Sequence, residues 1–312
     1  MRIGRAAGVT DTGRRRLRNE DAFICEPPLF AVADGMGGAR AGEIAAGIAA
    51  AALEEAGSEM RGATGVAALI EEANRRIWER SLTDPETAGM GTTVTAALVD
   101  AAGGTVAIGH VGDSRGYLLR GGTLEQLTTD HSLVNELVQS GILTPEEAER
   151  HPQRSAITRA LGTEPTVQVD AFTVDAAPGD VFLICSDGLS TMVADEDMVS
   201  AIETAEGDPA RAAEALVAAA NARGGEDNVT AVLFEILEGD EAEAEPLEPD
   251  EPSAEEVGVD PDRDQPPETD PQATDAAVQR HGAGKGGRLA ALLLVAAALG
   301  IGFLAVYWGV TR

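Results

Sequence analysis

The chain has 312 residues, 44% of them hydrophobic and 24% charged, so it is long enough for one large folded domain with additional segments. Its formal net charge of −30 argues against a nucleic-acid partner, because non-specific binding to phosphates depends on clustered Lys and Arg. The two cysteines, Cys25 and Cys185, lie far apart in apolar stretches, which favours buried free thiols in a reducing compartment over a disulfide.

Strand-like runs occupy much of the first 239 residues. Apolar, β-branched and aromatic residues between Gly-rich turns predict strands at 22–25, 29–33, 92–99, 105–111, 115–120, 167–174, 181–185 and 229–237. Gly103-Gly104 and Gly121-Gly122 mark hairpins between consecutive strands. Hairpins join antiparallel neighbours, so the sheets should be antiparallel.

Helical patterns flank these strands. Two long ones come early, at 41–56 and 64–81, and two come late, at 196–205 and 209–223. They predict an α+β domain over residues 1–239, with helices covering both faces of stacked antiparallel sheets. Between strands, residues 130–162 are polar and have few large apolar side chains, which predicts a mostly helical, mobile flap.

A second segment has a composition that cannot form a core. Residues 240–275 contain fifteen acidic residues, one basic residue and seven prolines. We interpret residues 240–288 as a disordered, acidic, Pro-rich linker. Residues 1–239 have a net charge of about −20, so the folded part is acidic in its own right and suited to binding cations.

The last apolar stretch is long enough to cross a membrane. Residues 289–308 carry no charge, and a helix of that length spans roughly 30 Å, the thickness of a bilayer core. The alternative is a buried core helix. Three basic residues precede the stretch and only Arg312, in the short tail 309–312, follows it. We therefore expect a single-pass protein of the cell membrane, with its large domain in the cytoplasm.

Acidic residues gather at the ends of the apolar runs. Asp34 and Asp187 each close a run and precede a glycine, Asp227 precedes another run, and Glu20-Asp21 lie upstream. Taken alone, each is better explained as a plain turn. Together they offer the hard oxygen donors that Mg²⁺ or Mn²⁺ prefers, and therefore indicate metal-assisted chemistry.

The ordered set of motifs is more specific than any one of them. It consists of Asp11 to Asp21, Asp34 to Gly38, Gly91 to Thr93, Gly109 to Arg115, Ser186 to Gly188 and Gly225 to Thr230. The set resembles the type 2C family of metal-dependent protein serine/threonine phosphatases over about residues 4–237. Motifs in the flap, including His131 and His151, resemble its bacterial branch. The resemblance implies a four-layer α/β/β/α sandwich.

The resemblance also implies a metal site with two divalent ions, Mn²⁺ or Mg²⁺. Asp34 would bridge the two ions and Gly35 would offer its carbonyl to one of them. The other ion would be held by Asp187 and Asp227. Glu20 and Asp21 would complete the shell, directly or through water. Such a site activates a water for in-line attack on phosphorus, so no covalent phosphoenzyme is required.

Three further positions follow from the resemblance. Arg16 would bind the substrate phosphate, because a guanidinium can donate two parallel hydrogen bonds to phosphate oxygens. Asp113 would hold a weaker third ion with Asp187, or is simply part of a structural turn. Met36 stands where many eukaryotic members have a histidine that is proposed to act as general acid, and a thioether cannot donate a proton.

The expected function is hydrolysis of phosphoserine and phosphothreonine on cytoplasmic proteins, with Arg16 and Asp34 as the catalytic residues. The expected partners are phosphoprotein substrates, including membrane Ser/Thr kinases and their targets, and the membrane itself. Two alternatives remain: a catalytically silent phosphoprotein-binding scaffold, and a phosphatase of an anti-sigma-factor antagonist. The three neighbours of Arg16 (Arg14, Arg15 and Arg18) form either a solvated basic edge or an attractive surface for substrates.

Overall fold

The computed structural model describes residues 1–37, 41–57 and 59–239. The three segments predicted to be linker, membrane helix and tail lie outside the described residues, at 240–288, 289–308 and 309–312. Among the residues that are described, no helix is both long and apolar enough to span a bilayer.

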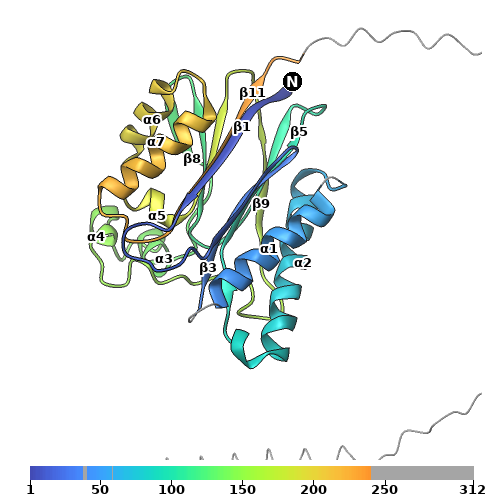
Figure 1. Cartoon of the computed structure of the whole chain (residues 1–312), viewed down its shortest axis with the longest axis vertical. Coiled ribbons are helices and arrows are strands. Elements are labelled where there is room, and N and C mark those ends of the chain that lie inside the picture. Colours follow the sequence, from blue (N-terminus) through green and yellow to red (C-terminus); the bar gives the residue numbers. More distant parts are fainter. Residues whose placement is uncertain (38–40, 58, 240–312) are drawn as a thin grey trace, which may run out of the picture. The chain divides into compact units, whose positions relative to one another are not determined.

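Two antiparallel sheets form the centre of the domain (Figure 1). The first has five strands in the order β1-β11-β10-β7-β8. Their bounds are β1 (Arg2–Asp11), β11 (Val229–Leu237), β10 (Val181–Cys185), β7 (Arg115–Arg120) and β8 (Thr123–Gln126).

The second sheet has the order β2-β3-β5-β6-β9, and the short strand β4 pairs with the end of β3. Its strands are β2 (Asp21–Glu26), β3 (Leu29–Met36), β4 (Gly91–Thr92), β5 (Val94–Asp100), β6 (Thr105–Val111) and β9 (Asp170–Asp175). Both predicted hairpins are present: Gly103-Gly104 join β5 to β6, and Gly121-Gly122 join β7 to β8.

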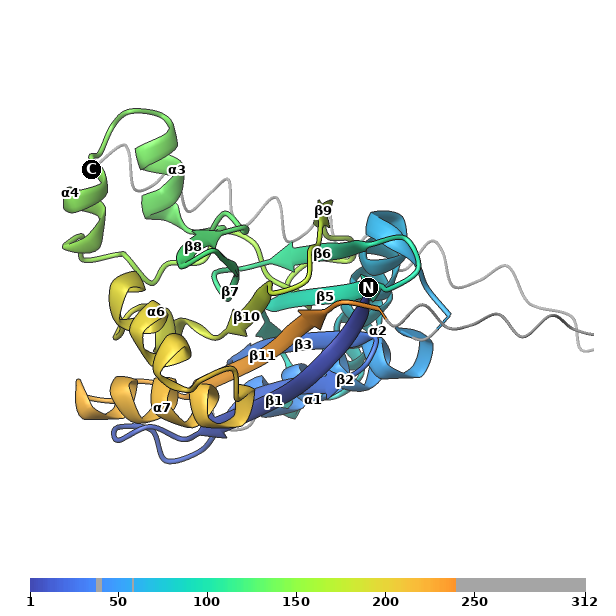
Figure 2. The same cartoon turned by 90° about the horizontal axis from the view of Figure 1, so that it is seen from above.

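Helices cover the outer face of each sheet (Figures 1 and 2). The second sheet is covered by α1 (Ala41–Gly57) and α2 (Gly62–Thr83). The first is covered by α5 (Asp187–Ser190), α6 (Asp195–Thr204) and α7 (Pro209–Ala222). The remaining elements are a 3₁₀ turn (Pro85–Thr87), α3 (Leu133–Gln139) and α4 (Pro145–Glu149).

Local sequence explains these helices. In α1, buried alanines recur on one face and let the helix lie close to β3, and alanine is the best helix former. In α7, Asp208 caps the first turn by accepting a hydrogen bond from the backbone N–H of Ala210 at 3.0 Å, and Pro209 occupies the first helical position.

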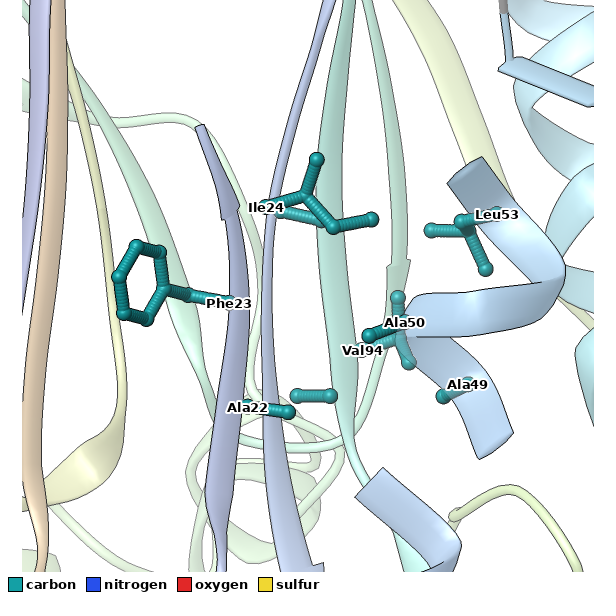
Figure 3. A pocket seen from close by; sticks show the side chains of 9 residues that line it. Ala22, Phe23, Ile24, Ala49, Ala50, Leu53 and Val94 are labelled. Carbon is teal, nitrogen blue, oxygen red and sulfur yellow. The ribbon is translucent and has the colours of Figure 1, made fainter. Parts of the chain in front are cut away.

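The core between the sheets is built around three stacked aromatic rings. Phe234 of β11 stacks on Phe30 of β3 at a centroid distance of 4.1 Å and on Phe182 of β10 at 5.0 Å. Strand β2 shows the alternation that separates the layers: Phe23 points to this inter-sheet core, whereas Ile24 faces α1 (Figure 3). The apolar gap drawn there has no polar lining and is too narrow for a water molecule.

The predicted fold class, two antiparallel sheets flanked by helices, is therefore confirmed. Four strands have the predicted bounds: β6, β7, β10 and β11. Two strands, β1 and β8, were not predicted. The insert at 130–162 was expected to be mostly helical, but it contains only α3 and α4, because its remaining residues form turns that dock on the sheets.

Both cysteines were predicted to be buried free thiols, which is right for Cys185 and wrong in part for Cys25. Both thiols are free, and Cys185 in β10 is fully buried. Cys25 is only half-buried, because it lies in β2, an edge strand that has a hydrogen-bonded neighbour on one side only.

Candidate active site

The candidate acidic residues meet at one end of the sandwich. Strands β3, β6 and β10 end there, and β2, β7 and β11 begin there, because neighbouring antiparallel strands run in opposite directions. This arrangement brings six acidic side chains to the same end of the two sheets, although they are far apart in sequence: Glu20, Asp21, Asp34, Asp113, Asp187 and Asp227.

Asp21 and Asp34 are direct partners across the β2–β3 ladder. The backbone of Asp34 is tied to the next strands, since its carbonyl accepts hydrogen bonds from the N–H of Thr93 and the hydroxyl of Thr92, both at 2.9 Å. The Asp21 carboxyl accepts a bond from the hydroxyl of Thr230 at 2.6 Å through one oxygen. Its other oxygen, Oδ1, is buried and has no protein partner in the described part of the chain.

Asp187 is the first residue of α5 and follows β10 directly. Its carboxyl is close enough to Asp34 to influence that residue's pKa. Its Oδ1 is the second buried carboxylate oxygen in the described residues that lacks a partner. Asp227 stands just before β11, with its side chain 32% exposed. Asp113 follows β6 and is 8% exposed.

Gly35 and Glu20 lie on the α1 side of this group. A Cβ at Gly35 would come within 2.3 Å of the Gly42 carbonyl oxygen and 2.5 Å of the Glu20 carbonyl oxygen, so only glycine fits there. The N–H of Gly35 donates to the Glu20 carbonyl at 3.2 Å. This close approach holds the start of β2, the end of β3 and the first turn of α1 together.

The electrostatics of the cluster favour a bound cation. Burial, assisted by neighbouring carboxylates, raises the pKa of Asp21 and Asp187 to about 6 and that of Asp113 to about 7. Burial also places the pKa of Asp34 well above its usual value, and the charges of Asp21, Asp187, Asp113 and Asp227 add to that effect. Several like charges in one partly buried place raise the free energy of the folded state unless a positive charge binds among them.

These residues therefore fit a pair of divalent ions. In the part of the chain that the structure describes, one buried carboxylate oxygen of Asp21 and one of Asp187 have no hydrogen-bond partner, which points to a missing positive partner. Carboxylates are the ligands that Mg²⁺ and Mn²⁺ prefer. Within residues 1–37, 41–57 and 59–239, no three acidic, His or Cys side chains stand as close as in a preformed metal cage. The charges of Asp21, Asp187, Asp113 and Asp227 all raise the pKa of Asp34, so these carboxylates lie close enough to repel one another.

The raised pKa values predict how stability depends on pH. In the unfolded chain these carboxyls titrate near about 4, so the folded protein binds extra protons between about pH 4 and pH 7. The stabilising contribution is complete below that range and is lost as the pH rises through about 6 to 7. We expect the metal-free protein to lose about 1–3 kcal/mol from these groups, or roughly 2–10 °C in Tm, between about pH 5 and pH 7.5.

Thermal unfolding in EDTA and in Mn²⁺ at the two pH values checks this prediction. The increase in Tm on adding Mn²⁺ should be larger at the higher pH, because the ligands are then ionised. An equal increase at both pH values would contradict the proposed role of these carboxyls.

Arg16 reaches the cluster from the loop that follows β1. Its guanidinium donates to Asp227 Oδ2 at 2.6 Å while half of its side chain stays exposed. Although partial burial opposes its charge, the attraction of Asp227, Glu20 and Asp34 raises the pKa of Arg16. A cation in this position can bind a phosphate that approaches the acidic group.

Asn228 is a positioning residue whose individual role was not predicted. Its side-chain N–H₂ donates to the carbonyls of Thr12 at 2.9 Å and Arg18 at 2.8 Å, and its Oδ1 accepts a bond from the N–H of Glu20 at 2.8 Å. Asn228 belongs to the motif Gly225 to Thr230, but the positions of that motif in the sequence do not show that the Asn228 side chain holds both ends of the Arg16 loop.

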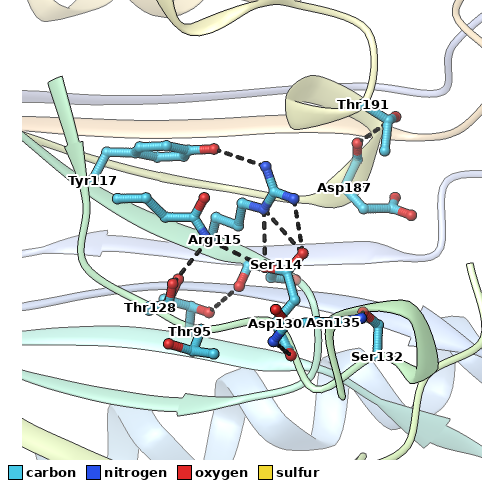
Figure 4. A network of polar contacts seen from close by, with 12 residues as sticks. Thr95, Ser114, Arg115, Tyr117, Thr128, Asp130, Ser132, Asn135, Asp187 and Thr191 are labelled. Carbon is cyan, nitrogen blue, oxygen red and sulfur yellow. Dashed lines mark hydrogen bonds and ion pairs between the residues drawn. The ribbon is translucent and has the colours of Figure 1, made fainter. Parts of the chain in front are cut away.

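The insert docks beside the site through a second arginine (Figure 4). Arg115, at the start of β7, donates to both carboxylate oxygens of Asp130, with distances of 2.8 Å to 3.2 Å, and to the Tyr117 hydroxyl at 3.3 Å. Asp130 begins the insert, and Asp187 projects from α5 near the same guanidinium. Arg115 was cited as part of a motif, but this ion pair could not be read from its sequence.

The histidines support backbone structure, as expected for residues of this kind. His131 Nδ1 accepts a hydrogen bond from the N–H of Gly112 at 3.0 Å, and its Nε2 lies 3.1 Å from Asp170. His110, at the end of β6, is buried, and burial lowers its pKa to about 4. His151 only accepts a bond from the N–H of Gln153, at 3.2 Å.

Met36 ends strand β3, where it pairs with Gly91 of β4. The side chain that follows Asp34-Gly35 at the end of β3 is therefore a thioether and not an imidazole. The structure places Asp113 as a buried carboxyl next to Asp187, so both the ion-binding and the turn interpretation of this residue remain consistent with its position.

Comparison with known proteins identifies the same group of relatives. A family model described as protein phosphatase 2C matches residues 13–234. The chain is 41% identical over 249 residues to the serine/threonine protein phosphatase PstP of Mycobacterium tuberculosis. That alignment covers 78% of this chain but only 47% of the relative. It is also 41% identical over 238 residues to the serine/threonine phosphatase stp of Listeria welshimeri, covering 72% of this chain and 93% of that one.

A solved structure agrees with the fold. The catalytic domain of PstP in complex with two manganese ions superposes with a TM-score of 0.69 at 38% identity, covering 76% of this chain and 99% of that one. The chain therefore spans about half the length of the mycobacterial relative and nearly all of the Listeria relative.

Proposed function

Since the chain belongs to the protein phosphatase 2C family, we propose that it hydrolyses phosphoserine and phosphothreonine on cytoplasmic proteins. Its folded domain is that of a metal-dependent protein serine/threonine phosphatase. The observation that carries the proposal is the acidic cluster at the end of the sandwich, with unpartnered carboxylate oxygens on Asp21 and Asp187 and with Arg16 beside it.

The residues divide into ion ligands and phosphate ligands. Asp34 and Gly35 would hold the ions together with Glu20, Asp21, Asp187 and Asp227, and Asp113 would serve a weaker third ion. When bound, two divalent ions supply a nucleophile at neutral pH and neutralise phosphoryl charge. Arg16 would bind the phosphate through parallel hydrogen bonds and hold it beside the acidic cluster.

A phosphothreonine peptide separates an enzyme from a silent scaffold. The enzyme releases inorganic phosphate from the peptide and leaves the dephosphorylated peptide behind. A scaffold would bind the phosphopeptide, for example in a fluorescence anisotropy titration, without releasing phosphate. The complete set of acidic side chains favours release.

We also propose that residues 289–308 anchor the domain to the cell membrane, with the linker 240–288 as a tether. The support is compositional: an uncharged apolar stretch preceded by Arg280, Lys285 and Arg288. Such a tether would keep the domain near membrane kinases and their targets. Fractionation of cells that produce the full chain or residues 1–288 tests this, and a full chain recovered in the soluble fraction would contradict it.

A further inference from the structure

The loop between β1 and β2, drawn in dark blue in Figures 1 and 2, is strongly basic. It contains Arg14, Arg15, Arg16 and Arg18 within a domain whose net charge is about −20. All four side chains are exposed, and between them Leu17 is 99% exposed. Positive charge is therefore concentrated at the edge of the acidic cluster.

This loop is held in place rather than left free. The N–H of Arg14 donates to the Gly225 carbonyl at 2.7 Å, and the Arg18 carbonyl accepts from Asn228. Gly13 has φ of 80°, and a Cβ there would lie 2.1 Å from the Asp227 carbonyl oxygen, so only glycine fits this turn. The arginines are thus presented from a fixed backbone.

Only Arg16 has an acidic partner. Its ion pair with Asp227 directs it into the site, whereas Arg14, Arg15 and Arg18 form no ion pair with any residue in the described part of the chain. Unpaired cations on a domain of opposite net charge are available for an anionic ligand. Arg15 and Arg18 flank the phosphate-binding arginine on its two sides.

We infer that Arg14, Arg15 and Arg18 form a specificity surface that favours phosphopeptides with acidic residues near the phosphorylated residue. This inference rests on the proposed phosphatase function, since it assumes that Arg16 receives the phosphate. An extended peptide advances roughly 3.3 Å per residue, so side chains two or three residues from the phosphorylated one lie about 7–10 Å away. That distance reaches the neighbours of Arg16 on the same loop.

An anionic bilayer is the other surface that arginines and an exposed leucine could contact. The structure favours a peptide, because Arg16 in the middle of the loop bonds to Asp227 of the site, so an occupant of the loop also reaches the acidic cluster.

The test compares two phosphothreonine peptides that differ only in having Glu or Gln at the two positions on each side of the phosphorylated residue. The full chain in detergent should show a kcat/KM ratio, Glu peptide over Gln peptide, of about 3 to 10 at low salt, as expected of a few exposed ion pairs. The ratio should fall toward one at high salt, because salt screens exposed charges.

Two double variants with the same charge change separate a local effect from a global one. R15Q/R18Q should bring the ratio close to one. R2Q/R211Q, which removes two exposed arginines from β1 and α7, should keep it. An equal loss in both variants would overturn the inference, because the preference would then come from the charge of the whole domain.

The remaining outcomes are equally decisive. A wild-type ratio near one, with clear turnover of the Gln peptide, would overturn the specificity surface and leave the phosphatase function intact. A R15Q/R18Q variant that keeps the ratio but no longer binds phosphatidylserine vesicles would assign the loop to the bilayer and also overturn the inference. Absence of phosphate release from both peptides would overturn the proposed function itself, and this inference with it.

Discussion

The variant Asp34→Asn should lose more than about 100-fold in kcat/KM, because even a side chain that only supports a metal ligand contributes roughly 10- to 100-fold. Asp34 lies in the acidic cluster, where burial and the charges of four neighbouring carboxyls raise its pKa. Asn keeps the shape of the side chain but removes the negative charge with which Asp34 would hold a divalent ion. Phosphate release from a phosphothreonine peptide measures this loss.

The same variant has a second readout that does not depend on activity. Because burial and four like charges raise the pKa of Asp34, its removal should make the metal-free protein slightly more stable at neutral pH. The increase in Tm on adding Mn²⁺ should then be much smaller than in the wild type. The matched control is Asp175→Asn, an exposed position at the end of β9, which should change neither quantity.

Near-normal turnover by Asp34→Asn would remove Asp34 from the ion-binding set. A variant that is inactive and also unfolds at lower temperature would point instead to a structural role at the end of β3. The two readouts together distinguish these cases.

Replacing Arg16 by Ala should raise KM by about 10- to 100-fold, since hydrogen bonds to charged groups contribute about 1.5–3 kcal/mol. The structure supports this because Arg16 is the only arginine of its loop that turns toward an acidic residue of the site in the described part of the chain. Inhibition by inorganic phosphate should weaken in parallel. Arg16→Lys should recover only part of the affinity, because an ammonium cannot donate two parallel hydrogen bonds.

Arg2→Ala, at the start of β1, is the control for this variant, and it should leave KM and phosphate inhibition unchanged. If Arg16→Ala also left KM, kcat and phosphate inhibition unchanged, another residue would hold the phosphate.

Much of the fold could be predicted from the sequence because its central strands are covered on both faces. β10 and β11 lie between a helix layer and the second sheet, so nearly all of their side chains are apolar. A continuous apolar run in the sequence therefore marks each of these strands. The two edge strands of the first sheet, β1 and β8, gave no such signal. β1 is rich in Arg, Gly and Ala, and its pairing with β11 was decided by tertiary contacts; a Cβ at Gly8 would come within 2.4 Å of the Phe23 ring.

The convergence of the acidic side chains was predictable from residue type and order, but the contacts that support them were not. The acidic residues could be named because carboxylates at strand ends form a recognisable set of motifs. Two contacts that support the site join residues that are not neighbours in sequence. Asn228 holds the Arg16 loop from the other end of the domain, and Arg115 binds Asp130 of the insert across a hairpin. Spacing along the chain contains no information on such pairs.

The measurement that tests the central conclusion most directly is phosphate release from a phosphothreonine peptide by protein freed of metal ions, then supplied with Mn²⁺, with Mg²⁺ or with EDTA. Relatives that consist almost entirely of this domain justify a parallel assay of residues 1–239. Turnover that appears with a divalent ion and disappears with EDTA is the predicted result. Folded protein that releases no phosphate with either ion, or that releases it equally well in EDTA, would contradict a metal-dependent phosphatase.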